Sequence, residues 1–337
     1  MLPRGAFNLY YQVVSELAEP PKYEAIRQSL AARALPDRTP LAAGNLASIV
    51  AVGEILWDLF PDGRRLGGAP LNFSAHARHL GHPVSLISAL GGDALGAEAS
   101  ATIKALSLDR RYLQISKQLA TGTAGVALSA DGSPRFAIVR PAAYDDVELT
   151  ADTLQQLRQC RPAWFYFGSL FAATPRGKHC LNALFDALDG AVKFLDLNLR
   201  PGSDDPSLVA ELLARANVVK LNEEELDRVR TLTGLQGSLE AFCVAASERF
   251  GWRAVAVTLG DRGCAIHSDG DYTEAPGHAV TVVDTVGAGD AFSAALVHGL
   301  SQHWPTAKTA EFANRLAAAV AGRPGALPDS RQGGVMP

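Results

Sequence analysis

The sequence predicts an α/β protein built on a doubly wound, mostly parallel sheet flanked by helices. Short apolar segments recur from Ser48 onward, and each is followed by a polar or glycine turn and then by a helix-like stretch. This alternation is typical of parallel strands connected by helices. The chain has 337 residues, which is enough for one large domain of this kind or for two smaller ones.

Apolar runs mark the expected strands. The last of them is almost continuously apolar and β-branched, which is typical of a buried strand in a parallel sheet. In chain order, the expected strands are residues 49–52, 86–90, 164–167, 192–195, 218–221, 254–259 and 279–283.

Polar or glycine residues end each expected strand. In open α/β sheets, ligands bind outside the carboxyl ends of the strands, so we expect these residues to share one cleft. In chain order they are Gly53-Glu54, Gly91-Gly92-Asp93, Gly168-Ser169, Asn198 with Arg200, Asn222 with Glu225, Gly260-Asp261 and the glycine turn 287–289.

Two segments break the strand–helix rhythm and predict a small sheet outside the main one. Residues 55–66 and 121–139 have alternating or aromatic character, with turn sequences at 62–63 and 131–134. We expect antiparallel strands here. They would form either a lid that keeps water out of the cleft or two surface hairpins.

The first 46 residues differ from the rest of the chain. Pro20-Pro21 interrupts the segment, and Tyr23, Ile26 and Leu30 have the spacing of a short amphipathic helix. We interpret this part as an appended helical arm with little function. Its mixture of basic and acidic residues argues against a targeting peptide.

Composition excludes several classes of partner. The formal net charge of −4 provides no basic surface for nucleic acid or for an acidic membrane. The four cysteines lie far apart without metal-ligand spacing, which fits a reducing compartment. No apolar run reaches membrane-spanning length, and no signal-peptide core is present. We therefore expect a cytoplasmic protein with no nucleic-acid or membrane partner.

A glycine-rich turn at residues 284–290 joins the last expected strand directly to a helix. Its glycines allow close approach of a ligand, and the unpaired N–H groups at the helix start form a site for an anion such as phosphate. We interpret Gly287, Ala288 and Gly289 as this anion site. Asp290 would then be the base that takes a proton from an attacking hydroxyl. The alternative is a capped helix with Asp290 as a dipole partner.

Three histidines, His76, His79 and His82, lie close together in one expected helix and the turn that follows. Their spacing is irregular and no carboxylate accompanies them, so we expect exposed helix histidines rather than metal ligands.

Several motifs resemble one known family. Residues 67–75 (Gly-Gly-Ala-Pro-Leu-Asn-Phe-Ser-Ala) and 284–290 look like the two signatures of the ribokinase (PfkB-type) carbohydrate kinases. Residues 53–58, 196–201 and 220–225 are similar to the fructokinase branch of that family. The resemblance runs from about Ile49 to Pro328 and implies a ribokinase-like fold with a small β lid.

The resemblance also implies a division of the chain. Residues 1–46 would be an N-terminal helical extension and residues 331–337 a tail. Residues 47–330 would form the kinase domain, with lid segments at about 55–66 and 121–140.

The resemblance assigns roles around a sugar. It makes Asp290 the catalytic base and Gly287 to Gly289 the anion site. Carboxylate and amide side chains suit a polyol, because together they accept and donate hydrogen bonds. The implied sugar-binding residues are Asp58, Gly67, Gly68, Asn72, Arg140 and Arg200, although Arg140 would equally suit a solvated surface position.

The resemblance also implies a nucleotide site. Asn222 and Glu225 would order metal-bound water at the phosphates of the nucleotide, and Glu225 would reach magnesium through that water. Further nucleotide-side residues are Thr258, Gly260, Gly263 and Asn314, the last of which could equally be a helix-surface amide. A monovalent cation such as K⁺ would bind near Asp284, Val286 and Gly325.

These assignments predict an ATP-dependent, magnesium-requiring sugar kinase whose leading substrate is D-fructose, phosphorylated at its 6-hydroxyl. Ribose, 2-keto-3-deoxygluconate and a purine nucleoside remain as alternative substrates. A non-catalytic sugar- or nucleotide-binding regulator is the competing class. The edge strands of the lid also predict a homodimer.

Overall fold

The computed structural model describes residues 21–31, 46–128 and 134–328 of the chain. Its centre is a nine-stranded sheet with the order β13-β12-β11-β10-β9-β8-β1-β4-β5. The strands are β1 (Ile49–Val52), β4 (Val84–Gly91), β5 (Leu113–Ser116), β8 (Trp164–Gly168), β9 (Val192–Asp196), β10 (Val218–Asn222), β11 (Ala254–Thr258), β12 (Cys264–Ser268) and β13 (Asp271–Ala275). The predicted fold class, a mostly parallel α/β sheet, is confirmed.

Successive strands are added to one side of β1 first and to its other side afterwards. This strand pairs in parallel with β4 on one side and with β8 on the other. The chain first extends the sheet through β4 and β5, and then returns to β8 and continues through β11. Such a switch point leaves a crevice outside the carboxyl ends of the strands, where ligands of open α/β sheets bind.

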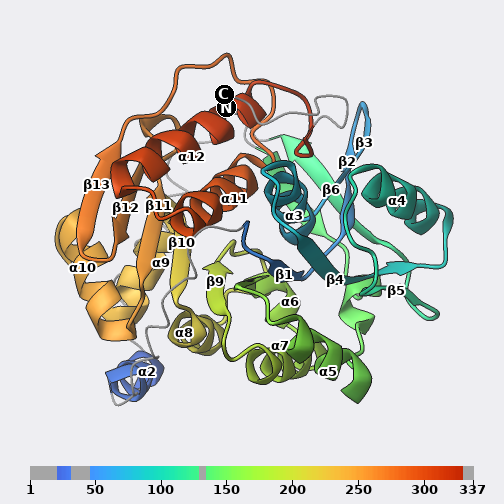
Figure 1. The fold of residues 1–337 in the computed structure, drawn as a ribbon, viewed down its shortest axis with the longest axis horizontal. Coiled ribbons are helices and arrows are strands. Elements are labelled where there is room, and N and C mark those ends of the chain that lie inside the picture. Colours follow the sequence, from blue (N-terminus) through green and yellow to red (C-terminus); the bar gives the residue numbers. More distant parts are fainter. Residues whose placement is uncertain (1–20, 32–45, 129–133, 329–337) are drawn as a thin grey trace, which may run out of the picture.

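Helices cover both faces of the main sheet, with an apolar core on each side (Figure 1). One face packs against α3 (Ala69–His79), α4 (Ala94–Ala105), α11 (Ala288–Ser301) and α12 (Thr306–Ala321). The other face carries α5 (Ala151–Cys160), α6 (Ser169–Ala172), α7 (Pro175–Ala187), α8 (Pro206–Arg215), α9 (Glu223–Thr233) and α10 (Leu239–Phe250). Among the described residues, no helix is both long enough and apolar enough to cross a bilayer.

The small sheet outside the main one is present. Its order is β3-β2-β6-β7, formed by β2 (Leu56–Phe60), β3 (Gly63–Gly67), β6 (Gly122–Leu128) and β7 (Pro134–Ile138). Each hairpin is antiparallel, as expected, but the two hairpins join through a parallel pairing of β2 with β6. The all-antiparallel prediction is therefore wrong at this pairing. The expected turn at 131–134 falls mostly outside the described residues.

The predicted strand at residues 279–283 is wrong. Val280, Val282 and Val283 are 40%, 60% and 56% exposed, and the segment pairs with no strand of the described sheet. It runs past the end of α12 instead, where the Val283 N–H donates to the Ala321 carbonyl at 2.8 Å. Apolar composition alone does not make a strand, because a strand also needs a neighbouring edge with which to pair.

Two of the three histidines that we expected on the surface are buried. His76 is 2% exposed and His82 is 0% exposed. His76 Nε2 lies 2.8 Å from the Ala326 carbonyl, and His82 lies between the Ala47 carbonyl at 2.9 Å and His298 at 3.1 Å. The prediction failed because α3, which carries His76, and the turn after it, which carries His82, both pack against neighbouring elements that include α11, and an imidazole can satisfy its polar atoms there.

Helix α2 (Pro21–Ala31) docks against the main domain near α8, α9 and α10 (Figure 1). Tyr23 and Ile26 pack against the apolar core, as their spacing predicted. Arg27 donates to the carbonyls of Thr231 at 2.8 Å and Leu232 at 3.4 Å, close to the C-terminal end of α9. A guanidinium is favourable at a helix C-terminus, where carbonyls lack intrahelical partners.

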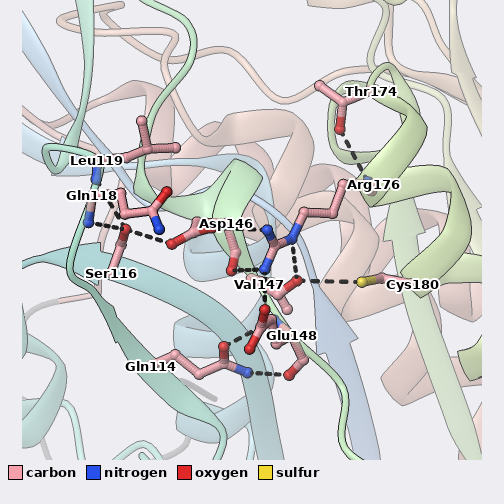
Figure 2. Close-up of polar contacts among 11 residues, drawn as sticks. Gln114, Ser116, Gln118, Leu119, Asp146, Val147, Glu148, Thr174, Arg176 and Cys180 are labelled. Atoms are coloured by element: carbon pink, nitrogen blue, oxygen red, sulfur yellow. Dashed lines mark hydrogen bonds and ion pairs between the residues drawn. The ribbon is translucent and has the colours of Figure 1, made fainter.

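A polar network ties α7 to the short helix η1 (Ala143–Asp146), as Figure 2 shows. Arg176 contacts Asp146 at 3.0 Å and donates to the Val147 carbonyl at 3.2 Å and Glu148 at 2.8 Å. The Ser116 hydroxyl at the end of β5 also donates to Asp146, at 2.7 Å. The network holds η1 in place beside the end of the small sheet.

Candidate functional site

A cavity of about 350 Å³ lies at the carboxyl ends of the parallel strands. Residues from the small sheet, including Asp58, line one side, and residues that follow the strands of the main sheet line the other. The glycine turn before α11 completes it. The switch point of the sheet and the small sheet therefore enclose one site, to which the predicted strand ends contribute Glu54, Asn198, Arg200 and Asn222.

Asp290 lies in the first turn of α11 and lines this cavity while only 7% exposed. Its Oδ2 accepts a hydrogen bond from Asn72 Nδ2 at 2.8 Å. Burial, and then the nearby charge of Asp196, raise the pKa of Asp290 to about 6. A carboxyl group with this pKa is mostly ionised at neutral pH and suits a general base.

The turn before α11 requires glycine at position 287. Gly287 has φ +81°, and a Cβ placed there would lie 2.3 Å from the Cβ of Ala326. Gly287 is the N-cap of α11, so the N–H groups of Gly287 and Gly289 have no carbonyl acceptor within the helix, whereas the Ala288 N–H donates to the Thr285 carbonyl at 3.3 Å. Together with the helix dipole they favour an anion at the cavity.

Lys220 brings an ammonium group to the same turn, and sequence reasoning missed it. It is 6% exposed, lines the cavity, and would lie 3.0 Å from a Cβ at Gly289. Its Nζ is 3.2 Å from Asp196 Oδ1. Burial lowers the pKa of Lys220, but the charges of Asp196, Glu225 and Asp290 outweigh it, so the net shift is upward and the ammonium stays charged. The available signal was one lysine inside an otherwise apolar strand.

Behind Lys220, Asp196 is completely buried and fully engaged. Its Oδ2 accepts from the Ser293 hydroxyl at 2.8 Å, and its Oδ1 faces Lys220. Ser293 comes from α11, so this network links β9, β10 and the helix that carries Asp290. It fixes α11 against the sheet one turn after its start.

Asp58 and Asn72 face each other near the glycine pair 67–68. Asp58 is 4% exposed, and burial raises its pKa to about 7. A Cβ at Gly67 would lie 2.9 Å from Asp58 Oδ2, and one at Gly68, with φ +110°, would lie 2.4 Å from the Glu54 carbonyl oxygen. Asn72 Oδ1 is buried without a hydrogen-bond partner among the described residues, which leaves an acceptor for a ligand.

Arg200 and Glu54 complete the polar lining on this side. The charge of Arg200 lowers the pKa values of Asp58, Glu54 and Asp290, although burial dominates all three. Sequence reasoning placed Arg200 at the site but gave Glu54 no role beyond that of a strand end.

Arg140, by contrast, is not among the residues that line the cavity. Its guanidinium forms an ion pair with Asp145 and donates to the Leu170 carbonyl at 3.0 Å. These contacts link the residue that follows β7 to η1 and α6. The contacts of Arg140 therefore hold neighbouring segments together and do not reach into the cavity.

Asn222 lines the cavity and caps α9. Its Oδ1 accepts from the Glu225 N–H at 2.9 Å, and its own N–H donates to Glu225 Oε2 at 2.9 Å. Glu225 is 3% exposed, and its Oε1 accepts from the Leu199 N–H at 2.8 Å. Both oxygens of Glu225 thus hold backbone groups next to the site, and Glu225 itself does not line it.

The other nucleotide-side residues lie outside the cavity lining, around β11, β12 and α12. Thr258 ends β11, Gly260 and Gly263 flank the short helix η2 (Gly260–Arg262), and Gly263 has φ +102°. Asn314 is 6% exposed rather than on the helix surface. It donates to the carbonyls of Ala275 and Pro276, both at 3.1 Å, and so anchors the end of β13.

The residues proposed for a monovalent cation are adjacent. Asp284 Oδ1 accepts from the Val286 N–H at 3.0 Å, and Oδ2 accepts from the Gly325 N–H at 3.1 Å. The aspartate side chain therefore joins the glycine turn to the segment after α12.

The cavity suits a hydrated magnesium ion better than a ligand-rich metal centre. In the described part of the chain, no group of three His, Cys, Asp or Glu side chains is arranged to hold a metal. Magnesium keeps several waters and binds phosphate oxygens, so it needs few protein ligands. The oxygens of Asn222 and Asp290, which line the cavity, suit contacts of this kind.

An open α/β sheet with a small covering sheet thus places a buried carboxyl beside a helix N-terminus that favours an anion. The sequence model of the protein family described as "pfkB family carbohydrate kinase" matches residues 62–332 of this chain. The chain belongs to this family.

Known fructokinases are similar to this chain over most of its length. It is 32% identical to Fructokinase-1 of Zea mays over 316 residues, covering 86% of this chain and 95% of the relative. It is 31% identical to a fructokinase of Salmonella typhimurium over 309 residues, covering 85% and 97%. The solved fructokinase of Vibrio cholerae O395 in its fructose, ADP and calcium ion bound form superposes with a TM-score of 0.68 at 26% identity, covering 85% and 96%.

Proposed function

We propose that the protein transfers the terminal phosphoryl group of ATP to a primary hydroxyl of a sugar, with D-fructose converted to fructose 6-phosphate as the leading reaction. One observation carries the proposal. Asp290, a buried carboxyl with a pKa of about 6, lies in the first turn of the same helix whose N-terminus and neighbouring Lys220 favour an anion.

In this mechanism, Asp58 and Asn72 orient the sugar through its hydroxyl groups. Asp290 accepts the proton of the attacking hydroxyl, while the Asn72 amide holds the carboxylate in position. The N–H groups of residues 287–289 and the Lys220 ammonium neutralise charge on the transferring phosphoryl group. Closure of the small sheet excludes water, which would otherwise compete with the sugar.

The proposal includes two bound ions, magnesium and K⁺. A magnesium ion would offset the negative charge of the nucleotide phosphates. Asn222, which caps α9 together with Glu225, would contact the water shell of this ion. The cluster of Asp284, Val286 and Gly325 would hold K⁺ through its carbonyl oxygens and so stabilise the glycine turn.

The alternative substrates share this chemistry. Ribose needs the same hydroxyl contacts as fructose. The acid 2-keto-3-deoxygluconate needs a cation for its carboxylate, and Arg140, which was our candidate, is paired with Asp145. A purine nucleoside needs an aromatic surface, whereas Trp57 in the small sheet is only 4% exposed and donates from Nε1 to the Leu95 carbonyl at 3.1 Å.

A panel of fructose, ribose, 2-keto-3-deoxygluconate and adenosine in a coupled assay for ADP tests the proposal. We expect fructose to have the highest kcat/KM. If none of these compounds supports ADP formation but calorimetry detects sugar binding, the non-catalytic regulator is the better explanation.

We also propose that the protein forms a homodimer through the small sheet. The order β3-β2-β6-β7 places β3 and β7 at the edges, and edge strands in proteins tend to be paired or covered. A monomeric sedimentation profile at micromolar concentration would count against it.

A further inference from the structure

Glu54 is a buried carboxyl to which the mechanism above gives no task. It lies two residues after the end of β1, at the switch point of the sheet, and is 7% exposed. Its side chain lines the main cavity, and it also borders a smaller adjoining cavity beside Ser169 and Asn198. Glu54 therefore lies where the main cavity meets the smaller one.

The carboxyl of Glu54 is held in a defined orientation. Its Oε1 accepts from the N–H of Ala69, the first residue of α3, at 3.2 Å. The N–H of Glu54 itself also acts on this carboxyl, and because a carboxyl has about four acceptor positions, these two backbone groups leave capacity for a ligand. Burial raises the pKa of Glu54 to about 7, which makes both the donating and the accepting form available at neutral pH.

The part of the cavity wall proposed to bind the sugar is rich in acidic side chains. Glu54, Asp58 and Asp290 all line the cavity, and all three have raised pKa values because of burial. Arg200 is the cation that acts on all three. Arg65 also acts on Asp58, and Lys220 also acts on Asp290, although its charge is shared with the buried Asp196. A ligand carboxylate in this wall would add negative charge beside three acidic side chains that already share Arg200, and this like-charge contact would disfavour its binding.

We propose that Glu54 is a substrate-binding residue that hydrogen-bonds a hydroxyl of the sugar, and that Glu54 and Asp58 together restrict the site to neutral polyols and exclude sugar acids. This inference rests on the proposed function, because it concerns the acceptor pocket of the same reaction. It assigns the choice between fructose and 2-keto-3-deoxygluconate to two carboxyl groups.

Glu54→Gln tests the first part, since glutamine retains an oxygen for the Ala69 N–H and changes only the charge and one acceptor. Fructose binding is measured by calorimetry without ATP, and KM and kcat are measured for fructose and for ATP. Loss of a hydrogen bond to a charged group costs about 1.5–3 kcal/mol, so we expect the fructose Kd and KM to rise by roughly 10- to 100-fold. The KM for ATP should stay within about twofold of the wild-type value.

Glu240→Gln, on the exposed start of α10, is the matched control and should change neither constant. Thermal melting checks folding. If Glu54→Gln does not fold, Glu54→Asp, which shortens the side chain by one methylene, provides the same test and should also weaken fructose binding. An unchanged fructose Kd in the folded variant would overturn the role of Glu54.

The selectivity is tested with 2-keto-3-deoxygluconate as the competing substrate. We expect wild-type kcat/KM for this acid to be at least about 100-fold below that for fructose, and the double variant Glu54→Gln/Asp58→Asn to narrow this ratio. Equal or better use of the acid by the wild type would overturn the selectivity. Absence of phosphorylation for every sugar would instead reject the kinase proposal, while the calorimetric comparison would still decide whether Glu54 binds sugar.

Discussion

Asn72 Nδ2 donates a 2.8 Å hydrogen bond to Asp290 Oδ2, across 218 positions of sequence. The contact joins the two motifs on which the family resemblance depends, one at the start of α3 and the other at the start of α11. It lowers the pKa of Asp290 against the larger opposing effect of burial. The amide therefore helps to keep a buried carboxyl ionised and oriented in the cavity.

Replacing the proposed base should abolish most of the chemistry and leave sugar binding largely intact. We expect Asp290→Ala to lower kcat by roughly 10²- to 10⁴-fold, which is the usual contribution of a positioned base. The KM for sugar should change little in a coupled assay. A decrease of less than about tenfold would remove Asp290 from the mechanism.

The pH dependence of kcat should follow the ionisation of Asp290. The active form is the carboxylate and its pKa is about 6, so kcat should be near its plateau above pH 7 and should fall about tenfold per unit well below pH 6. Rates measured at saturating sugar and ATP between pH 5 and 8 test this. A flat profile down to pH 5 would contradict the assignment.

Asp58 should contribute mainly to sugar affinity. Because it is buried in the cavity wall and can accept hydrogen bonds from hydroxyl groups, Asp58→Ala should raise the sugar KM by roughly tenfold or more. The KM for ATP should change only modestly. An unchanged sugar KM would mean that the sugar pocket lies elsewhere.

Lys220 should act on the phosphoryl group. Removing one such electrostatic contact typically lowers kcat by about 10²- to 10³-fold, and we expect a loss of this size for Lys220→Met. That variant leaves Asp196 buried without its cation, so Lys220→Met/Asp196→Asn is needed to remove the folding defect. Lys193→Met, in the neighbouring strand β9, is the control. A double variant that folds normally and retains wild-type kcat would rule out the role.

The docked helix α2 should contribute to stability rather than to activity. Arg27→Ala removes hydrogen bonds to the carbonyls of Thr231 and Leu232, at a cost of about 1 kcal/mol. We expect the midpoint of thermal unfolding to fall by about 1–2 °C, with kcat and both KM values unchanged. Altered kinetics would instead indicate that this helix affects the site.

The parts of the fold that follow local rules were predictable. Strands β1, β4, β8, β9, β10 and β11 came from apolar runs, and the expected helix after the glycine turn is α11, whereas β5 was not predicted. Residues 279–283 have the same composition but form no strand, because the described sheet ends at β13 and offers them no partner. His76 and His82 were misjudged for a related reason, since burial depends on what packs against a helix.

The sequence by itself determined that residues 284–290 turn into a helix with a carboxylate in its first turn, because glycine conformations and helix periodicity are local properties. Only the tertiary structure decided that Asp290 meets Asn72, that Lys220 meets Asp196, and that Arg140 turns to Asp145 instead of the cavity. These pairings depend on how distant segments pack, since the energy of a hydrogen bond or an ion pair depends on distance and burial rather than on separation along the chain.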